Sequence, residues 1–250
     1  MKQIVRALAA LVVCFCVGIA VARADGVGPG TIHALRMSVF STGCLPGPNQ
    51  IAFGLVGNSG TGFFVSDRGD FITAKHVIQE ILGYGPRCNA VIFVPMGRWE
   101  DQTSLAGEKY FHFNAGSCRQ DPQFDVAACR TSDNPFDDAT VAANIAAVTF
   151  DVAEQPDGTD VAFSGFPLGY NQPVTAKASV GTYQRIDGLP EITLAGLSWH
   201  GTSGAPVYIG NRKVIGMIVA GEKGETAGLT LAVPASALVD FLKQSGVHAR

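Results

Sequence analysis

The sequence predicts an all-β fold. Short segments rich in β-branched or aromatic residues recur along the chain, and Gly, Pro, Asn and Asp separate them. These segments do not alternate with helical ones, as the strands of a parallel α/β sheet would. The chain also contains 30 glycines, which suits the many turns and bulges of a barrel. We therefore expect a sandwich or barrel of short strands.

Ten segments account for this prediction, because strand-forming residues are concentrated in them and turn-forming residues lie between them. In chain order the predicted strands are IAFGLV (51–56), GFFVS (62–66), FITAKHV (71–77), AVIFV (90–94), VAACR (126–130), VAFSGF (161–166), ITLA (192–195), VYIG (207–210), KVIGMIVAG (213–221) and LTLAV (229–233).

The clearest helical signal lies at the C-terminal end. Pro234 precedes a segment in which Leu238, Phe241 and Leu242 have the i, i+3, i+4 spacing of one helix face, and Gly246 provides a stop. We expect this helix to pack against the strands and to carry no chemistry. ANIAAV (143–148) is a further apolar element whose type the pattern leaves open.

The N-terminal residues indicate export. Two basic residues precede an apolar run at 7–21, and the small residues Ala22 and Ala24 follow it. The run is shorter than the roughly 20 residues that span a bilayer. We interpret residues 1–24 as a signal peptide cleaved after Ala24, and an uncleaved membrane anchor is the alternative. The mature protein would be periplasmic or secreted, without further contact with the membrane.

Removing residues 1–24 takes away three basic residues and no acidic residue, so the net charge changes from −3 to −6. No basic cluster remains that could neutralise a phosphate backbone, which argues against a nucleic-acid partner. The remaining 226 of the 250 residues can bury a substantial core, as one domain or as two packed units. We expect no cofactor and no metal.

Four cysteines remain after cleavage, and an even number in an exported protein favours two disulfides. Three pairings are possible. If VIFVPM (91–96) and KYFHFN (109–114) form a hairpin, Cys88 and Cys118 fall near the open end of the same ladder, which leaves Cys44 with Cys129. Free buried thiols are the alternative.

Three residues have the side chains and the sequence contexts expected of a nucleophile, its base and a carboxylate that orients the base. His76 ends the predicted strand 71–77, Asp125 precedes the strand 126–130, and Ser203 lies between glycines in HGTSGAP (200–206). A serine hydroxyl needs a neighbouring imidazole to take its proton, and a fixed carboxylate selects the useful imidazole tautomer. Each residue alone has an ordinary structural interpretation: the serine as a loop residue, the histidine as a hydrogen-bonded structural residue and the aspartate as a turn former.

Taken together, these segments resemble the chymotrypsin-like serine peptidases, especially the bacterial branch that includes Do-like and glutamyl endopeptidases. The resemblance covers roughly residues 50–242 and is carried by GTGFFVSDRGDFITAKHV (60–77), FDVAAC (124–129), GFP (165–167) and GTSGAP (201–206). It implies two packed six-stranded antiparallel β-barrels with the catalytic residues between them.

On this basis we expect four parts: a signal peptide at 1–24, an N-terminal extension at 25–49, a first barrel at 50–145, and a second barrel with the C-terminal helix at 146–250. We expect no PDZ domain after the second barrel, and we expect a monomer.

The resemblance implies roles for the three residues. His76 is the general base, Asp125 orients it, and Ser203 is the nucleophile. Gly201 lets the chain turn so that its own N–H and that of Ser203 point to one spot, where the oxygen of a tetrahedral intermediate would be stabilised. The remaining histidines lack such a context, and we expect structural or solvent-exposed positions for them: His33, His112, His200 and His248.

Two departures from the family pattern affect activation and specificity. Thr202 replaces the aspartate that pairs with a new N-terminus in vertebrate-type members, so we expect activity without internal cleavage. Leu197 replaces the acid that selects Lys or Arg, and Ile218 replaces the histidine of glutamyl endopeptidases. With the uncharged walls Val219, Gly221 and Gly228, an apolar primary specificity pocket is predicted.

The sequence thus predicts an exported serine endopeptidase acting on proteins or peptides. The main alternative is a non-catalytic protein-binding module on the same fold. An α/β-hydrolase using Ser203, Asp240 and His248 is disfavoured, because that serine turn requires a glycine where this chain has Ala205.

Overall fold

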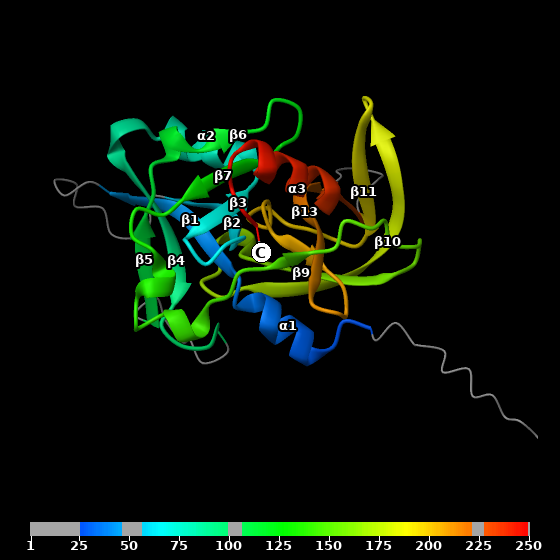
Figure 1. Ribbon diagram of the computed structural model, residues 1–250, viewed down its shortest axis with the longest axis horizontal. Helices are drawn as coiled ribbons and strands as arrows, with labels where there is room; N and C mark the ends of the chain where they lie inside the picture. Colours follow the sequence, from blue (N-terminus) through cyan, green and yellow to red (C-terminus); the bar gives the residue numbers. More distant parts are fainter. Residues whose placement is uncertain (1–25, 47–56, 100–106, 222–227, 250) are drawn as a thin grey trace, which may run out of the picture.

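The computed structural model describes residues 26–46, 57–99, 107–221 and 228–249. It consists of two β-sheets with few helices, as the sequence predicts. In Figure 1 the first sheet occupies the left half and the long strands β10 and β11 lie at the right. The predicted signal peptide at 1–24 and the predicted strand at 51–56 lie outside the described residues.

The first sheet is antiparallel, with the order β5-β4-β1-β2-β3-β7-β6. The main chain at His112 and Phe113 reaches across to the end of β7: Phe113 bridges to Thr131, and the Ser132 N–H donates to the His112 carbonyl at 2.7 Å. This contact brings the two ends of a six-strand set together. Its strands are β1 (Val39–Pro46), β2 (Gly57–Phe64), β3 (Asp70–Thr73), β4 (Cys88–Pro95), β5 (Glu108–His112) and β7 (Ala127–Arg130), with the short β6 (Arg119–Gln120) beside β7.

The second sheet is a closed six-stranded barrel in the order β12-β9-β10-β11-β14-β13, because β12 also pairs with β13. The short β8 adds to β13 in parallel. The strands are β8 (Thr149–Phe150), β9 (Asp160–Gly165), β10 (Val174–Ile186), β11 (Leu189–Ala195), β12 (Pro206–Tyr208), β13 (Lys213–Gly221) and β14 (Leu229–Pro234).

Each barrel has its own buried core, and a third core joins the two. In the first barrel the Phe40 ring packs on Phe64 and Phe71, with ring centroids 4.5 and 5.2 Å apart. The joint core contains Phe63 of β2 and Tyr208 of β12, both fully buried. Since this core spans both sheets, burial of its apolar surface stabilises their mutual packing.

In the part of the chain that the structure describes, three α-helices accompany the sheets: α1 (Pro29–Arg36), α2 (Lys75–Gly83) and α3 (Ala235–Gln244). The predicted C-terminal helix is confirmed as α3, which buries Leu238, Phe241 and Leu242, and Gly246 follows it with φ 71°. The segment 143–148 is neither helix nor strand beyond a 3₁₀ turn at Ala142–Asn144. None of the helices in the described ranges has the length and apolarity needed to cross a bilayer.

Two predictions of local structure were wrong. The predicted strand 71–77 ends at Thr73, and α2 begins at Lys75. The reason is that Val77, Ile78 and Ile81 are all buried, which is one face of a helix and not alternate residues of a strand. Residues 39–46 of the predicted extension 25–49 form β1 in the middle of the first sheet.

The described residues contain two disulfides, as predicted, but the pairing suggested by the hairpin argument was wrong. The bonds join Cys44 to Cys88 and Cys118 to Cys129, with Cα–Cα distances of 5.0 and 4.5 Å. The predicted hairpin of β4 and β5 does form. However, β1 lies on the other side of β4 and brings Cys44 beside Cys88, whereas β6 and β7 pair directly beside Cys118 and Cys129.

Candidate active site

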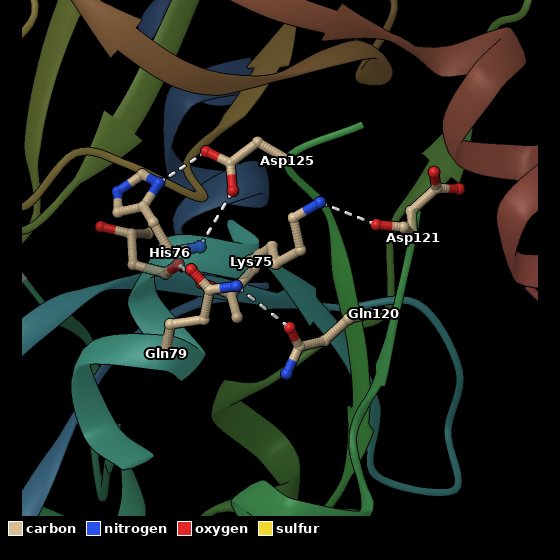
Figure 2. A network of polar contacts seen from close by, with 8 residues as sticks. Lys75, His76, Gln79, Gln120, Asp121 and Asp125 are labelled. Carbon is tan, nitrogen blue, oxygen red and sulfur yellow. Dashed lines mark hydrogen bonds and ion pairs between the residues drawn. The ribbon is translucent and has the colours of Figure 1, made fainter. Parts of the chain in front are cut away.

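The start of α2 and the loop before β7 bring a histidine and an aspartate together (Figure 2). His76 lies in the first turn of α2, and its ring Nδ1 is 2.5 Å from Oδ2 of Asp125. The backbone N–H of His76 donates to Oδ1 of the same carboxylate at 2.9 Å. Both carboxylate oxygens are therefore engaged by one residue, which fixes the orientation of the imidazole.

Neighbouring contacts hold these two elements in place (Figure 2). Lys75 Nζ donates to the Asp121 carbonyl at 2.8 Å. The Asp121 carboxylate accepts the backbone N–H groups of Gln123 and Phe124 at 2.8 and 2.9 Å. This turn shapes the loop that carries Asp125, so Asp121 has a structural role in the described loop.

Contact between His76 and Asp125 shifts the pKa of each side chain in the direction that favours His76 as a general base. The hydrogen bond to Asp125 raises the pKa of His76 above its ordinary 6.5; burial opposes this rise, and the charges of Asp125 and Glu80 add to it. Burial by itself would raise the pKa of Asp125. The hydrogen bonds and charge of His76, with the charge of Lys75, lower it below its ordinary 3.8. An ionised Asp125 keeps the proton of neutral His76 on Nδ1 and leaves Nε2 as the acceptor.

The predicted nucleophile lies on a tight turn between β11 and β12. The Thr202 N–H donates to the Trp199 carbonyl at 3.0 Å, and Gly201 has φ 94°. A Cβ at Gly201 would collide with the carbonyl oxygen of Phe166. Glycine is therefore required at this position for both conformation and space.

The same turn packs against the chain that leads into His76. The Thr61 N–H donates to the Ser203 carbonyl at 2.9 Å. A Cβ at Gly204 would collide with the Thr61 carbonyl oxygen and would lie 2.6 Å from Thr73 Oγ1. Because Thr73 precedes His76 by three residues, the structure brings the backbone of Ser203 close to the start of α2.

The backbone N–H groups of Gly201 and Ser203 donate to no protein acceptor in the described part of the chain, whereas those of Thr202, Gly204 and Ala205 do. The Gly201 N–H belongs to the same peptide group as the His200 carbonyl, which accepts the Leu168 N–H at 2.8 Å. Since the C=O and N–H of one peptide point in opposite directions, the Gly201 N–H faces away from Leu168. Among the described hydrogen bonds, none joins the Ser203 hydroxyl to the His76 ring.

The residues of the predicted specificity pocket also lie near one another. The Gly196 N–H donates to the Gly228 carbonyl at 2.8 Å, so Leu197 follows directly beside Gly228. Residues 219–221 end β13, where Gly221 pairs with Thr230 of β14. Apart from its chain neighbours, no atom of the described residues lies within 4 Å of a Cβ built at Gly228, and Leu197 is 55% exposed.

Sequence reasoning did not identify three residues beside the serine turn. Leu168 and Trp199 expose 68% and 43% of their surface, and Thr61 is fully buried beneath the turn. The motifs point to the histidine, aspartate and serine by their residue types. A threonine in a strand and two apolar loop residues carry no comparable signal in their residue types.

Comparisons with known proteins agree with this architecture. The profile of the family described as "Trypsin-like peptidase domain" matches residues 60–217. A comparison with curated protein sequences finds no significant match.

Similar solved structures include a mycobacterial protease and Deg5. The Rv3671c protease from M. tuberculosis in its active form has a TM-score of 0.64 at 20% identity, over 89% of each chain. Deg5 has a TM-score of 0.62 at 17% identity, over 88% of this chain and 95% of Deg5. At these identities the likeness shows the fold alone.

Proposed function

The chain belongs to the trypsin-like peptidases and is a serine peptidase, and we propose that it is an exported endopeptidase with His76, Asp125 and Ser203 as its catalytic triad. The observation that carries this proposal is the His76–Asp125 pair at 2.5 Å, located where the serine turn packs on Thr61 and Thr73. An imidazole held by a carboxylate beside such a serine is the arrangement of an activated nucleophile.

The proposed reaction has two halves. Ser203 Oγ bonds to the carbonyl carbon of the scissile peptide while its proton moves to Nε2 of His76, and the carbonyl electrons move onto the oxygen. The N–H groups of Gly201 and Ser203 stabilise that oxyanion. When it collapses, the C–N bond breaks and His76 protonates the leaving amine. Water then bonds to the acyl carbon while His76 takes its proton; the ester C–O bond breaks, His76 returns the proton to Ser203 Oγ, and the acid is released.

Thr202 supports activity without a new N-terminus. Its hydroxyl donates to the Trp199 carbonyl at 2.7 Å inside the turn, and the residue is buried. The turn is thus closed by a local hydrogen bond at the position where vertebrate-type members use an ion pair.

Export rests on the sequence of residues 1–24, and the two disulfides are compatible with it. We propose cleavage after Ala24 and protein or peptide substrates outside the cytoplasm.

Labelling with a fluorophosphonate probe tests the triad. The wild-type protein should be labelled, and labelling should vanish in Ser203→Ala and His76→Ala, because the probe requires an activated serine. Ser236→Ala on α3 and His248→Ala are matched controls outside the site and should be labelled like wild type. A folded wild-type protein that resists the probe would instead support a non-catalytic binding module.

An apolar residue is expected at the substrate position that precedes the cleaved bond. Leu197 offers an exposed apolar surface, and Ile218 is buried in the second barrel core, so neither supplies a charge. A charged side chain would lose hydration without gaining a partner. Profiling with a peptide library should favour apolar over Arg, Lys or Glu side chains by roughly 10²-fold. A strong preference for Arg or Lys would refute the apolar pocket.

A further inference from the structure

Thr61 of β2 connects the serine turn to two other segments of the proposed site. Its hydroxyl donates to the Gly201 carbonyl at 2.7 Å and accepts the Phe166 N–H at 3.0 Å. Its backbone N–H donates to the Ser203 carbonyl at 2.9 Å. Its carbonyl accepts the Thr73 hydroxyl at 2.6 Å. One fully buried residue of the first barrel thus binds the turn, the loop after β9 and the strand that leads to His76.

The Thr61 hydroxyl helps to orient both peptide groups that flank Gly201, one directly and the other through the loop after β9. It holds the carbonyl of the 201–202 peptide directly. It also holds the loop after β9 at Phe166, and two residues later the Leu168 N–H holds the carbonyl of the 200–201 peptide at 2.8 Å. Turning the Gly201 N–H away from its present direction would require the Leu168–His200 bond to break. The orientation of this N–H therefore depends on a network that begins at the Thr61 hydroxyl.

The backbone at Gly165 approaches this hydroxyl closely, because a Cβ at Gly165 would lie 2.8 Å from Thr61 Oγ1. The hydroxyl itself is buried and has two protein partners, the Gly201 carbonyl and the Phe166 N–H. These two hydrogen bonds hold it in its present position, as expected for a buried polar group.

We propose that Thr61 is a positioning residue for peptide hydrolysis. Its hydroxyl holds the Gly201 N–H toward the oxyanion of the tetrahedral intermediate. This inference rests on the proposed function. Thr61 does not touch the substrate; it acts through Gly201 and through the loop that carries Leu168.

Thr61→Val tests the inference, because valine has nearly the same shape but lacks the hydroxyl. With active enzyme counted by fluorophosphonate labelling, kcat for a peptide substrate should fall by about 10², the loss typical of one misplaced oxyanion donor, while KM changes little. Thr61→Ser keeps the hydroxyl and should restore kcat to within a few-fold of wild type. Thr61→Ala provides a second variant without the hydroxyl if valine prevents folding.

Two further measurements separate positioning from a general loss of structure. A peptidyl trifluoromethyl ketone, which forms an oxyanion on addition of Ser203, should lose affinity for Thr61→Val by about the same factor as kcat. The acid limb of the kcat/KM profile, which His76 sets, should stay at the wild-type pH. Ser59→Ala, a buried hydroxyl of the same strand without a protein partner in the described residues, is the matched control and should behave like wild type.

The outcomes distinguish the two proposals. If the folded wild type is neither labelled nor active, the proposed function fails and the role of Thr61 fails with it. If the wild type is active but Thr61→Val keeps full kcat and inhibitor affinity, the role of Thr61 alone is refuted. The same conclusion follows if Thr61→Ser loses as much activity as Thr61→Val, or if Ser59→Ala loses as much.

Discussion

Replacing Ser203 by alanine is expected to lower kcat for peptide hydrolysis by about 10⁶, and His76→Ala should cost nearly as much. The two groups act as one unit, because the hydroxyl becomes a nucleophile only when the imidazole takes its proton. The double variant should therefore be no slower than either single variant. Steady-state and single-turnover kinetics on one fluorogenic peptide, with all three variants, measure this non-additivity.

Ser236→Ala and His248→Ala are the controls for this set and should keep wild-type kcat. Residual hydrolysis in the double variant would report what substrate binding and the N–H groups of Gly201 and Ser203 contribute without a nucleophile. If losses in the single variants multiplied in the double variant, the serine and histidine would not be working together. Near-normal hydrolysis by Ser203→Ala would require a different nucleophile.

Asp125→Asn is expected to lower kcat by about 10⁴, the typical cost of losing the carboxylate in this arrangement. The carboxylate accepts from Nδ1 and from the backbone N–H of His76 at 2.5 and 2.9 Å. An amide supplies only one acceptor oxygen, and its NH₂ group can favour the tautomer with the proton on Nε2. That tautomer cannot accept the proton of Ser203.

The pH profile should change in a defined direction. Protonated His76 cannot act as a base, so kcat/KM should rise as pH increases through the His76 pKa. In the wild type this pKa is raised above 6.5, chiefly by the hydrogen bond to Asp125. In Asp125→Asn the charge is lost and burial, which lowers the pKa, remains. The acid limb should therefore move to lower pH while the plateau falls.

Asp240→Asn is the matched control, since Asp240 is an exposed carboxylate on α3 paired with Lys243 at 3.6 Å. It should leave both kcat and the pH profile unchanged. A large effect of Asp240→Asn would show that the loss of activity in Asp125→Asn is not specific to the carboxylate that binds His76. An unshifted acid limb in Asp125→Asn would show that Asp125 does not control the titration of His76.

The elements that were predicted correctly have patterns that can be read within a few residues. The β9 and β14 segments are short apolar runs bounded by turn residues, and α3 has a regular apolar face at Leu238, Phe241 and Leu242. By contrast, β10 has mostly exposed or half-buried residues along its length, so neither strict alternation nor an apolar run marks it. β1 contains Gly43 and Pro46, which weakened its strand signal.

The candidate active site was likewise predictable only in part. Residue type and glycine context singled out His76, Asp125 and Ser203, and they also pointed to Gly201, which has a positive φ in the structure. The sequence did not indicate that His76 would begin a helix. That position matters, because it allows the His76 backbone N–H and ring to bind the same carboxylate.

The sequence by itself therefore determined the all-β class, the C-terminal helix and the residue types available for chemistry, because these depend on local spacing and side-chain chemistry. Only the tertiary structure decided the disulfide partners, the placement of β1 and the contacts of Thr61. The physical reason is that strand pairing joins residues far apart in the chain: Cys44 meets Cys88 because β1 lies beside β4, and Thr61 meets Gly201 across 140 residues. Such contacts follow from the packing of whole barrels, which no short stretch of sequence encodes.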